Sequence, residues 1–109
     1  MEFKSYHFHL YFAFDQVELA TATAKQIESE FDIFVGRVWD RPVGPHPIGS
    51  CQITVPKEKF VDITNWLLVN RNGLDVFIHP EGGNDLIDHR DHIMWIGQSY
   101  EINLDIFNS

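Results

Sequence analysis

The fold is decided by residues 5–13, which read Ser-Tyr-His-Phe-His-Leu-Tyr-Phe-Ala and alternate strictly between two kinds of side chain. Positions 6, 8, 10 and 12 are all aromatic or aliphatic, whereas the positions between them carry His7, His9 and Tyr11. A period of two is typical of a β-strand with one face on a core. The sequence therefore predicts a strand that buries one face and presents two parallel imidazoles on the other.

The rest of the chain predicts a single α+β domain over residues 1–109. Helical spacing of apolar residues predicts one helix from Asp15 to Phe31 and a second from Pro56 to the Asn72-Gly73 pair. Extended segments are expected at residues 33–40, 50–55, 75–79 and 93–97. This order is β-α-β-β-α-β with an extra C-terminal strand, the pattern of a ferredoxin-like sandwich. Such a sheet has the strand order 4-1-3-2, so the first strand is central.

Finer expectations concern individual side chains and connections. In the second strand, Phe34 and Val38 are expected to face the core, with Arg37 and Trp39 on the open face. Trp66 and Trp95 are both assigned to the core. Residues 41–49 and 80–92 are expected to be loops, and the C-terminal tail is expected to be able to pair with a partner chain.

Composition excludes several classes of partner and site. The formal net charge is −8 and the pI is about 5.0, which argues against a nucleic acid or an anionic membrane as partner. Cys51 is the single cysteine, so an internal disulfide and a thiolate-rich zinc site are excluded, and a buried, inert thiol is expected. The sequence has no secretory-signal pattern and no apolar run of membrane-spanning length, so we expect a cytoplasmic protein.

The six histidines are the candidate chemical groups. In the predicted topology, the start of the first strand lies beside the end of the fourth, which places His7, His9 and His79 together on the face without helices. Three imidazoles with open positions are typical of a catalytic metal such as Fe, Zn, Cu or Ni. The alternative is a solvated His-x-His pair on an exposed sheet. His89 follows the fourth strand and can fold over the group, whereas His92 is expected to be a bystander.

Other residues are candidates for proton transfer and ligand orientation. His46 lies between Pro45 and Pro47, so its loop is rigid, and it is either an acid–base group, a ligand or an ordinary surface histidine. Three acidic residues are candidates to orient the metal-binding imidazoles through hydrogen bonds: Asp75, Asp88 and Asp91.

The open face also carries candidate substrate-binding residues. Arg37 can bind a carboxylate with two parallel hydrogen bonds, or form an ordinary surface ion pair. Tyr11, Trp39 and Phe77 can line a slot for an aromatic ring. An aromatic face of this kind is equally typical of a homodimer interface, and the two interpretations are compatible.

Several motifs resemble those of the DOPA 4,5-dioxygenase family of small extradiol-type enzymes. The matching blocks are Tyr6-His-Phe-His-Leu-Tyr-Phe12, Gly36-Arg-Val-Trp-Asp-Arg-Pro-Val-Gly-Pro-His-Pro47, His79-Pro-Glu-Gly-Gly83, Asp88-His89 and Trp95-Ile-Gly97. They follow in order over nearly the whole chain, and the long middle block is the most specific. The family pattern has a threonine between proline and glycine where this chain has Glu81-Gly82. This departure is expected to touch the loop and not a histidine, and so to alter loop shape rather than chemistry.

The resemblance implies a dimeric ferredoxin-like enzyme that opens a catechol ring with O2 and non-haem Fe(II). His9, His46, His79 and His89 match the motif histidines, and the topology adds His7. The resulting hypothesis gives the metal, Fe(II) or Zn2+ after purification, to His7, His9 and His79. His46 or His89 then acts as acid–base, and Arg37 holds a carboxylate of a 4-substituted catechol.

Two other functional classes remain open at this point. One is a non-catalytic metal- or ligand-binding dimer in which the histidines hold structural Zn2+. The other is an oxygenase that needs no cofactor. A closed four-ligand site would favour the first, and full activity in the presence of a chelator would favour the second.

Overall fold

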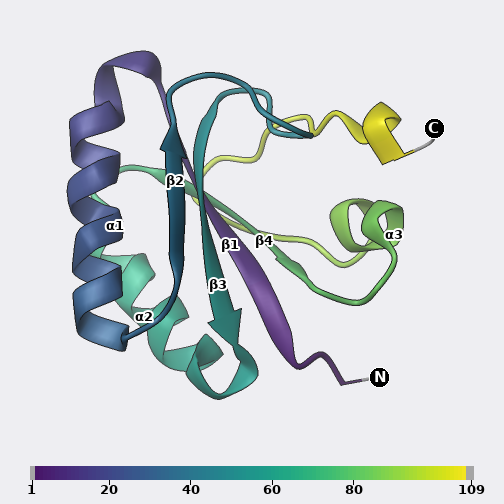
Figure 1. Cartoon of the computed structure of the whole chain (residues 1–109), viewed down its shortest axis with the longest axis horizontal. Helices are drawn as coiled ribbons and strands as arrows, with labels where there is room; N and C mark the ends of the chain where they lie inside the picture. The colour runs from purple at the N-terminus through teal and green to yellow at the C-terminus, as the bar shows by residue number, and fades with distance from the viewer. Residues whose placement is uncertain (1, 108–109) are drawn as a thin grey trace.

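The computed structural model describes residues 2–107 and contains one five-stranded antiparallel sheet in the order β2-β3-β1-β4-β5. Its strands are β1 (Ser5–Phe12), β2 (Val35–Trp39), β3 (Gly49–Pro56), β4 (Asp75–Pro80) and β5 (Met94–Ile96). Helices α1 (Val17–Phe31) and α2 (Phe60–Asn70) cover one face of the sheet (Figure 1). The α+β class, the central first strand and the extra strand are therefore confirmed.

The core lies between the sheet and these two helices. The apolar face of β1 supplies Phe8, Leu10 and Phe12, each at most 2% exposed, and α1 supplies Ala20, Ala24 and Ile27. Cys51 is fully buried in the same cluster, and its burial raises the pKa of the thiol to about 11. The predicted inert cysteine is confirmed, because a thiol with so high a pKa forms little thiolate at neutral pH.

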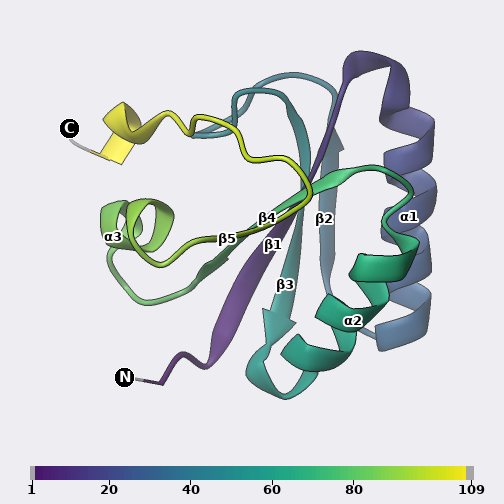
Figure 2. The same cartoon turned by 180° about the vertical axis from the view of Figure 1, so that it is seen from behind.

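The opposite face of the sheet, which we call the open face, is partly covered by the chain itself. The short helix α3 (Asp85–Arg90) and the 3-10 turn η3 (Leu104–Phe107) both lie on the side away from α1 and α2 (Figure 2). The backbone N–H of Asn103 donates to the Pro45 carbonyl at 2.9 Å, which ties the tail to the loop before β3. This part of the tail is therefore held against its own chain, and pairing of the tail with a partner chain stays a prediction.

The structure corrects the predicted starts of both helices. Asp15 belongs to a 3-10 turn, η1 (Phe14–Gln16), where the Gln16 side chain accepts the N–H of Ala13, and α1 begins only afterwards. Pro56 has extended dihedral angles and ends β3, and the 3-10 turn η2 (Lys57–Lys59) separates it from α2. Both helices thus begin with a tighter turn that the periodic pattern does not distinguish.

The orientation of β2 also differs from the prediction. The register against β3 shifts between Val35 and Val38, and both valines pack on the core. Phe34 is instead 68% exposed. The cause is the irregular register, because an extra residue in one strand reverses the faces of the residues before it.

Two further expectations are overturned on the open face. Trp95 of β5 pairs with Phe77 of β4, so its ring lies on the open face and not in the core. Trp66 does pack on the core, as expected. Part of the predicted loop between residues 80 and 92 is helix α3, whose first turn is capped by the Asn84 side chain accepting the Ile87 N–H at 3.1 Å. Among residues 2–107, no helix is long and apolar enough to cross a bilayer.

Candidate metal and substrate site

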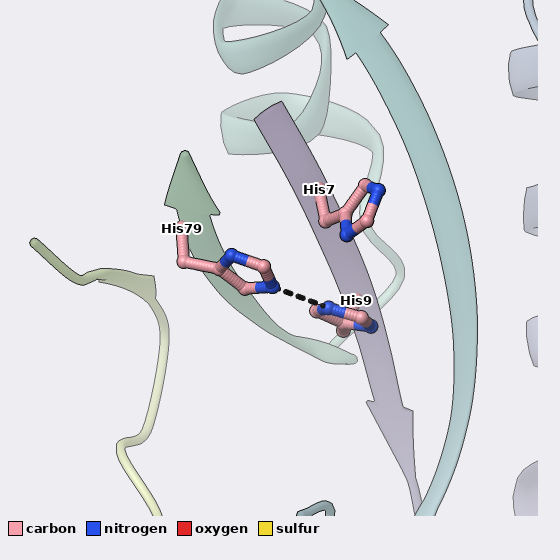
Figure 3. Close-up of side chains that lie close together, drawn as sticks. All are labelled: His7, His9 and His79. Carbon is pink, nitrogen blue, oxygen red and sulfur yellow. Dashed lines mark hydrogen bonds between the residues drawn. The ribbon is translucent and has the colours of Figure 1, made fainter. Parts of the chain in front are cut away.

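Strand register brings three histidines together on the open face. His7 of β1 lies directly opposite His79 of β4, and His9 lies two residues further along β1. Directly opposed and diagonal residues of neighbouring strands are the pairs whose side chains can touch. The Nε2 atoms of His9 and His79 are 3.1 Å apart, and Figure 3 shows the three rings gathered around one point. One ligand atom from each ring lies within 4.8 Å of the others, so the three could hold a metal ion.

Two more histidines join this group from outside the sheet. Helix α3 carries His89 to a ring separation of 3.9 Å from His79. The loop before β3 carries His46 to 4.2 Å from His9, and a turn closed by the His46 N–H on the Val43 carbonyl holds that loop. His92 is exposed and packs on Phe3, so it lies outside the cluster, as predicted.

The environment of His7, His9, His46 and His79 favours the neutral form of each ring. Burial lowers the pKa of His79 to about 3 and that of His46 to about 4, and it holds the pKa of His9 well below 6.5. The neighbouring imidazoles lower these values further, since two adjacent positive charges repel. The pKa of His7 is also lowered by burial, although the Glu81 carboxylate works in the opposite direction. Neutral imidazole is the form that binds metal ions.

Backbone carbonyls fix which nitrogen carries the proton on two of the rings. Nδ1 of His79 lies 2.8 Å from the Pro80 carbonyl, and Nδ1 of His89 lies 2.7 Å from the Asp85 carbonyl. A carbonyl only accepts hydrogen bonds, so each Nδ1 must carry the proton and donate. The lone pair of each ring is therefore on Nε2. In the metal-free protein the 3.1 Å contact is then His9 Nε2–H donating to His79, and a metal ion bound by both Nε2 atoms would require the His9 proton to move to Nδ1.

The carboxylate beside the histidines is one that sequence reasoning missed. Glu81 contacts Nε2 of His7 and accepts the hydroxyl of Ser5. If Nε2 of His7 carries the proton and donates it to Glu81, Nδ1 is left free to bind a metal ion. A carboxylate hydrogen-bonded in this way to the second ring nitrogen commonly orients metal-binding histidines. The departure at Glu81 thus touches a histidine, contrary to expectation. The backbone places Glu81 there, because the Glu81 N–H continues the β4 ladder onto the Ser5 carbonyl, beside the start of β1.

The three expected acidic partners are engaged elsewhere. Asp75 accepts the Gln98 N–H and the Tyr100 hydroxyl, Asp88 accepts the Gly82 N–H, and Asp91 pairs with Arg90. None of these hydrogen bonds is made with an imidazole.

The histidine cluster lies between two adjacent hollows that share part of their lining. The first, of about 470 Å³, is bounded by the histidines, the acidic residues of the 81–88 segment and Phe107. The second, of about 310 Å³, contains Arg37 and Trp39, with the guanidinium 4.1 Å above the indole ring. His9 and His46 line both hollows. A ligand in the second hollow therefore meets Arg37 at one side and the histidine cluster at the other.

Two residues predicted to contact substrate lie beneath the site instead. Tyr11 is 1% exposed and Phe77 is fully buried. Their rings pack against Trp95, His9 and His46 and form the floor under the histidines. This burial argues against direct contact with a substrate. It also leaves these two rings unable to make the dimer interface suggested by the aromatic face.

This arrangement can be compared with known proteins. Residues 6–106 match the model of the Dopa 4,5-dioxygenase family. The chain belongs to this family.

Individual relatives agree with this assignment. The chain is 38% identical to a DOPA 4,5-dioxygenase of Amanita muscaria, over 94% of this chain and 49% of that protein. It is 30% identical to an uncharacterized 21.2 kDa protein of Botryotinia fuckeliana, over 84% of this chain and 55% of that protein. The chain thus spans about half the length of these curated relatives. A crystal structure from Nostoc punctiforme, described as a "putative dioxygenase", superposes with a TM-score of 0.92 at 31% identity, covering 97% of this chain and 92% of that one.

Proposed function

We propose that this chain is a non-haem Fe(II) extradiol dioxygenase that opens the ring of a 4-substituted, DOPA-like catechol with O2. The observation that supports this most is the group His7, His9 and His79, which brings three imidazoles to one point in a cavity. Family membership supports the reaction class, and the name of the Amanita relative supports a DOPA-like substrate.

The three histidines fit a metal ion on chemical grounds. Their pKa values are lowered, so their lone pairs are available at neutral pH. Two nitrogens that each bind one ion at about 2.1 Å lie roughly 3 Å apart when the angle between the bonds is near a right angle. The 3.1 Å between Nε2 of His9 and of His79 matches this spacing. A three-histidine set accepts Fe(II) and also Zn2+, so purified protein should be reloaded before assay.

Iron held there would supply the redox chemistry that lets O2 react with a catechol. The protein's own groups supply binding and proton movement. His46 and His89 flank the three ligands and are within reach of a bound catechol's hydroxyl oxygens, where acid–base groups are needed. Arg37, at the far side of the second hollow, is placed to bind a carboxylate on the substituent of the ring. The ring centroid of Phe107 lies 4.6 Å from that of His89, and Phe107 lines the first hollow.

The homodimer suggested by the sequence stays a proposal. Its surface would lie elsewhere than on Tyr11 and Phe77, because both rings are buried within one chain.

The test is oxygen uptake by the Fe(II)-loaded protein with a panel of 4-substituted catechols. We expect uptake and a yellow ring-opened semialdehyde that depend on Fe(II), and the loss of both, together with metal binding, in His79→Ala. The matched control is His92→Ala, which removes an exposed histidine outside the cluster and should keep both properties.

Two results would contradict the proposal. Stoichiometric metal binding without oxygen uptake on any catechol would favour a non-catalytic metal-binding module. Full activity in the presence of a chelator would favour an oxygenase that needs no cofactor.

A further inference from the structure

One buried hydrogen bond at the site serves no purpose in metal binding. The hydroxyl of Tyr11 lies 2.7 Å from Nδ1 of His46, and the two rings meet edge to face. Tyr11 lies on β1 two residues beyond His9, and its side chain is fixed by the rings of Phe77, Trp95 and Tyr100. A hydroxyl held this rigidly can determine which nitrogen of the His46 ring carries the proton.

The direction of this hydrogen bond follows from the surroundings of the hydroxyl. Within the described residues, Nδ1 of His46 is its single hydrogen-bond partner, and Tyr11 is 1% exposed. If His46 donated instead, the buried O–H would have no acceptor, which costs about 1–3 kcal/mol. Tyr11 therefore donates, and Nδ1 of His46 accepts. The proton of the neutral imidazole must then be on Nε2, the nitrogen on the far side of the ring.

His46 thus differs from His79 and His89 in which ring nitrogen carries the proton. The Pro80 and Asp85 carbonyls hold His79 and His89 as Nδ1–H tautomers, with a lone pair on Nε2. Tyr11 holds His46 in the opposite tautomer. His79 and His89 are prepared to accept a proton or a metal ion, whereas His46 is prepared to donate a hydrogen bond.

We propose that Tyr11 is a positioning residue that holds His46 as the neutral Nε2–H tautomer, so that His46 donates a hydrogen bond to a substrate oxygen and the role of proton acceptor belongs to His89. This assignment of roles rests on the proposed function. His46 lines both hollows, so its Nε2–H can reach a ligand that bridges them. A neutral imidazole polarises an oxygen without giving up its proton, because the product would be an imidazolate. His46 then serves as neither metal ligand nor base.

The direct test is the tautomer of His46, read from long-range 1H–15N correlations of 15N-histidine-labelled protein, metal-free and with Zn2+. The His46 signals can be assigned by their loss in His46→Gln. We expect wild type to show a protonated Nε2 and an unprotonated Nδ1. Tyr11→Phe should lose this preference, whereas Tyr100→Phe, which removes a neighbouring hydroxyl bound to Asp75, should retain it. A protonated Nδ1 in wild type would overturn the proposal, and that result needs no folded variant.

A second measurement separates positioning from metal ligation. We expect Tyr11→Phe to bind Zn2+ as tightly as wild type, while kcat/KM of the Fe(II) form falls about ten- to a hundredfold, the usual effect of losing an orienting partner. A comparable fall in Zn2+ affinity would instead make His46 a ligand and overturn the assignment. If the wild-type protein turns over no catechol, the proposed function fails while the tautomer experiment still decides the role of Tyr11.

Discussion

Mild acid is expected to destabilise the metal-free protein, because the fold keeps several histidines neutral that an unfolded chain would protonate. The pKa is lowered to about 4 for His46 and about 3 for His79, and well below 6.5 for His9. In the unfolded chain each takes up its proton at about pH 6.5. A histidine with a lowered pKa contributes its full stability above the unfolded value. That stability is lost as the pH falls from 6.5 toward the folded value.

The loss is large relative to the stability of a domain. Each histidine that protonates only on unfolding lowers the free energy of unfolding by about 1.4 kcal/mol per pH unit. The three together remove about 4 kcal/mol by about pH 5.5, out of the roughly 5–15 kcal/mol available to a domain. Carboxylates contribute little in this window, because their ordinary pKa values are about 4.

The assay is urea unfolding of the metal-free protein at a series of pH values from about 7.5 to 5.5. His46→Gln should reduce the steepness of the pH dependence by about 1.4 kcal/mol per pH unit, the share of one proton. His92→Gln, at an exposed position, should leave the steepness unchanged. A free energy of unfolding that stays flat down to about pH 5.5 would refute the argument that these imidazoles are held neutral.

Two more changes probe the substrate hollow and its support. In steady-state assays, Arg37→Gln should raise KM about tenfold or more for catechols with a carboxylate on the substituent, because an ion pair made with a ligand contributes at least about 1.4 kcal/mol. The KM for 4-methylcatechol, which has no carboxylate, should not change. Equal effects on the two kinds of substrate would show that Arg37 does not bind the carboxylate. Gly49→Ala should destabilise the fold by about 1–3 kcal/mol in urea unfolding, since a Cβ there would lie 2.8 Å from the Phe12 ring and 2.9 Å from the Trp39 carbonyl. Unchanged stability would show that the start of β3 can move aside.

Much of the site could be predicted because it depends on local pattern and simple topology. The alternation over residues 5–13 places His7 and His9 on one face of a strand, and the central position of that strand follows from the order of the elements. His79 then falls beside them, since antiparallel neighbours bring the start of one strand to the end of the other. The sequence alone therefore predicted that His79 lies beside His7 and His9.

Other features could not be predicted because periodicity assigns a residue to a face and not to a partner. The irregular register of β2 exposes Phe34 and packs the partly buried Val35 against the core, and a single-residue shift of this kind leaves no mark in the hydrophobic pattern. The same limitation applied to Trp95. Its apolar character led to the prediction that it lies in the core, but its pairing with Phe77 places it on the open face.

By itself, the sequence determined the α+β order of elements, the buried face of β1 and the three histidines that could share a metal ion. Only the tertiary structure decided the proton positions on the rings. Those depend on single atoms brought close from distant parts of the chain, namely the carbonyls beside His79 and His89 and the hydroxyl beside His46. The physical reason is that a hydrogen bond depends on tenths of an ångström and on direction, whereas a hydrophobic pattern specifies only which side of an element is buried.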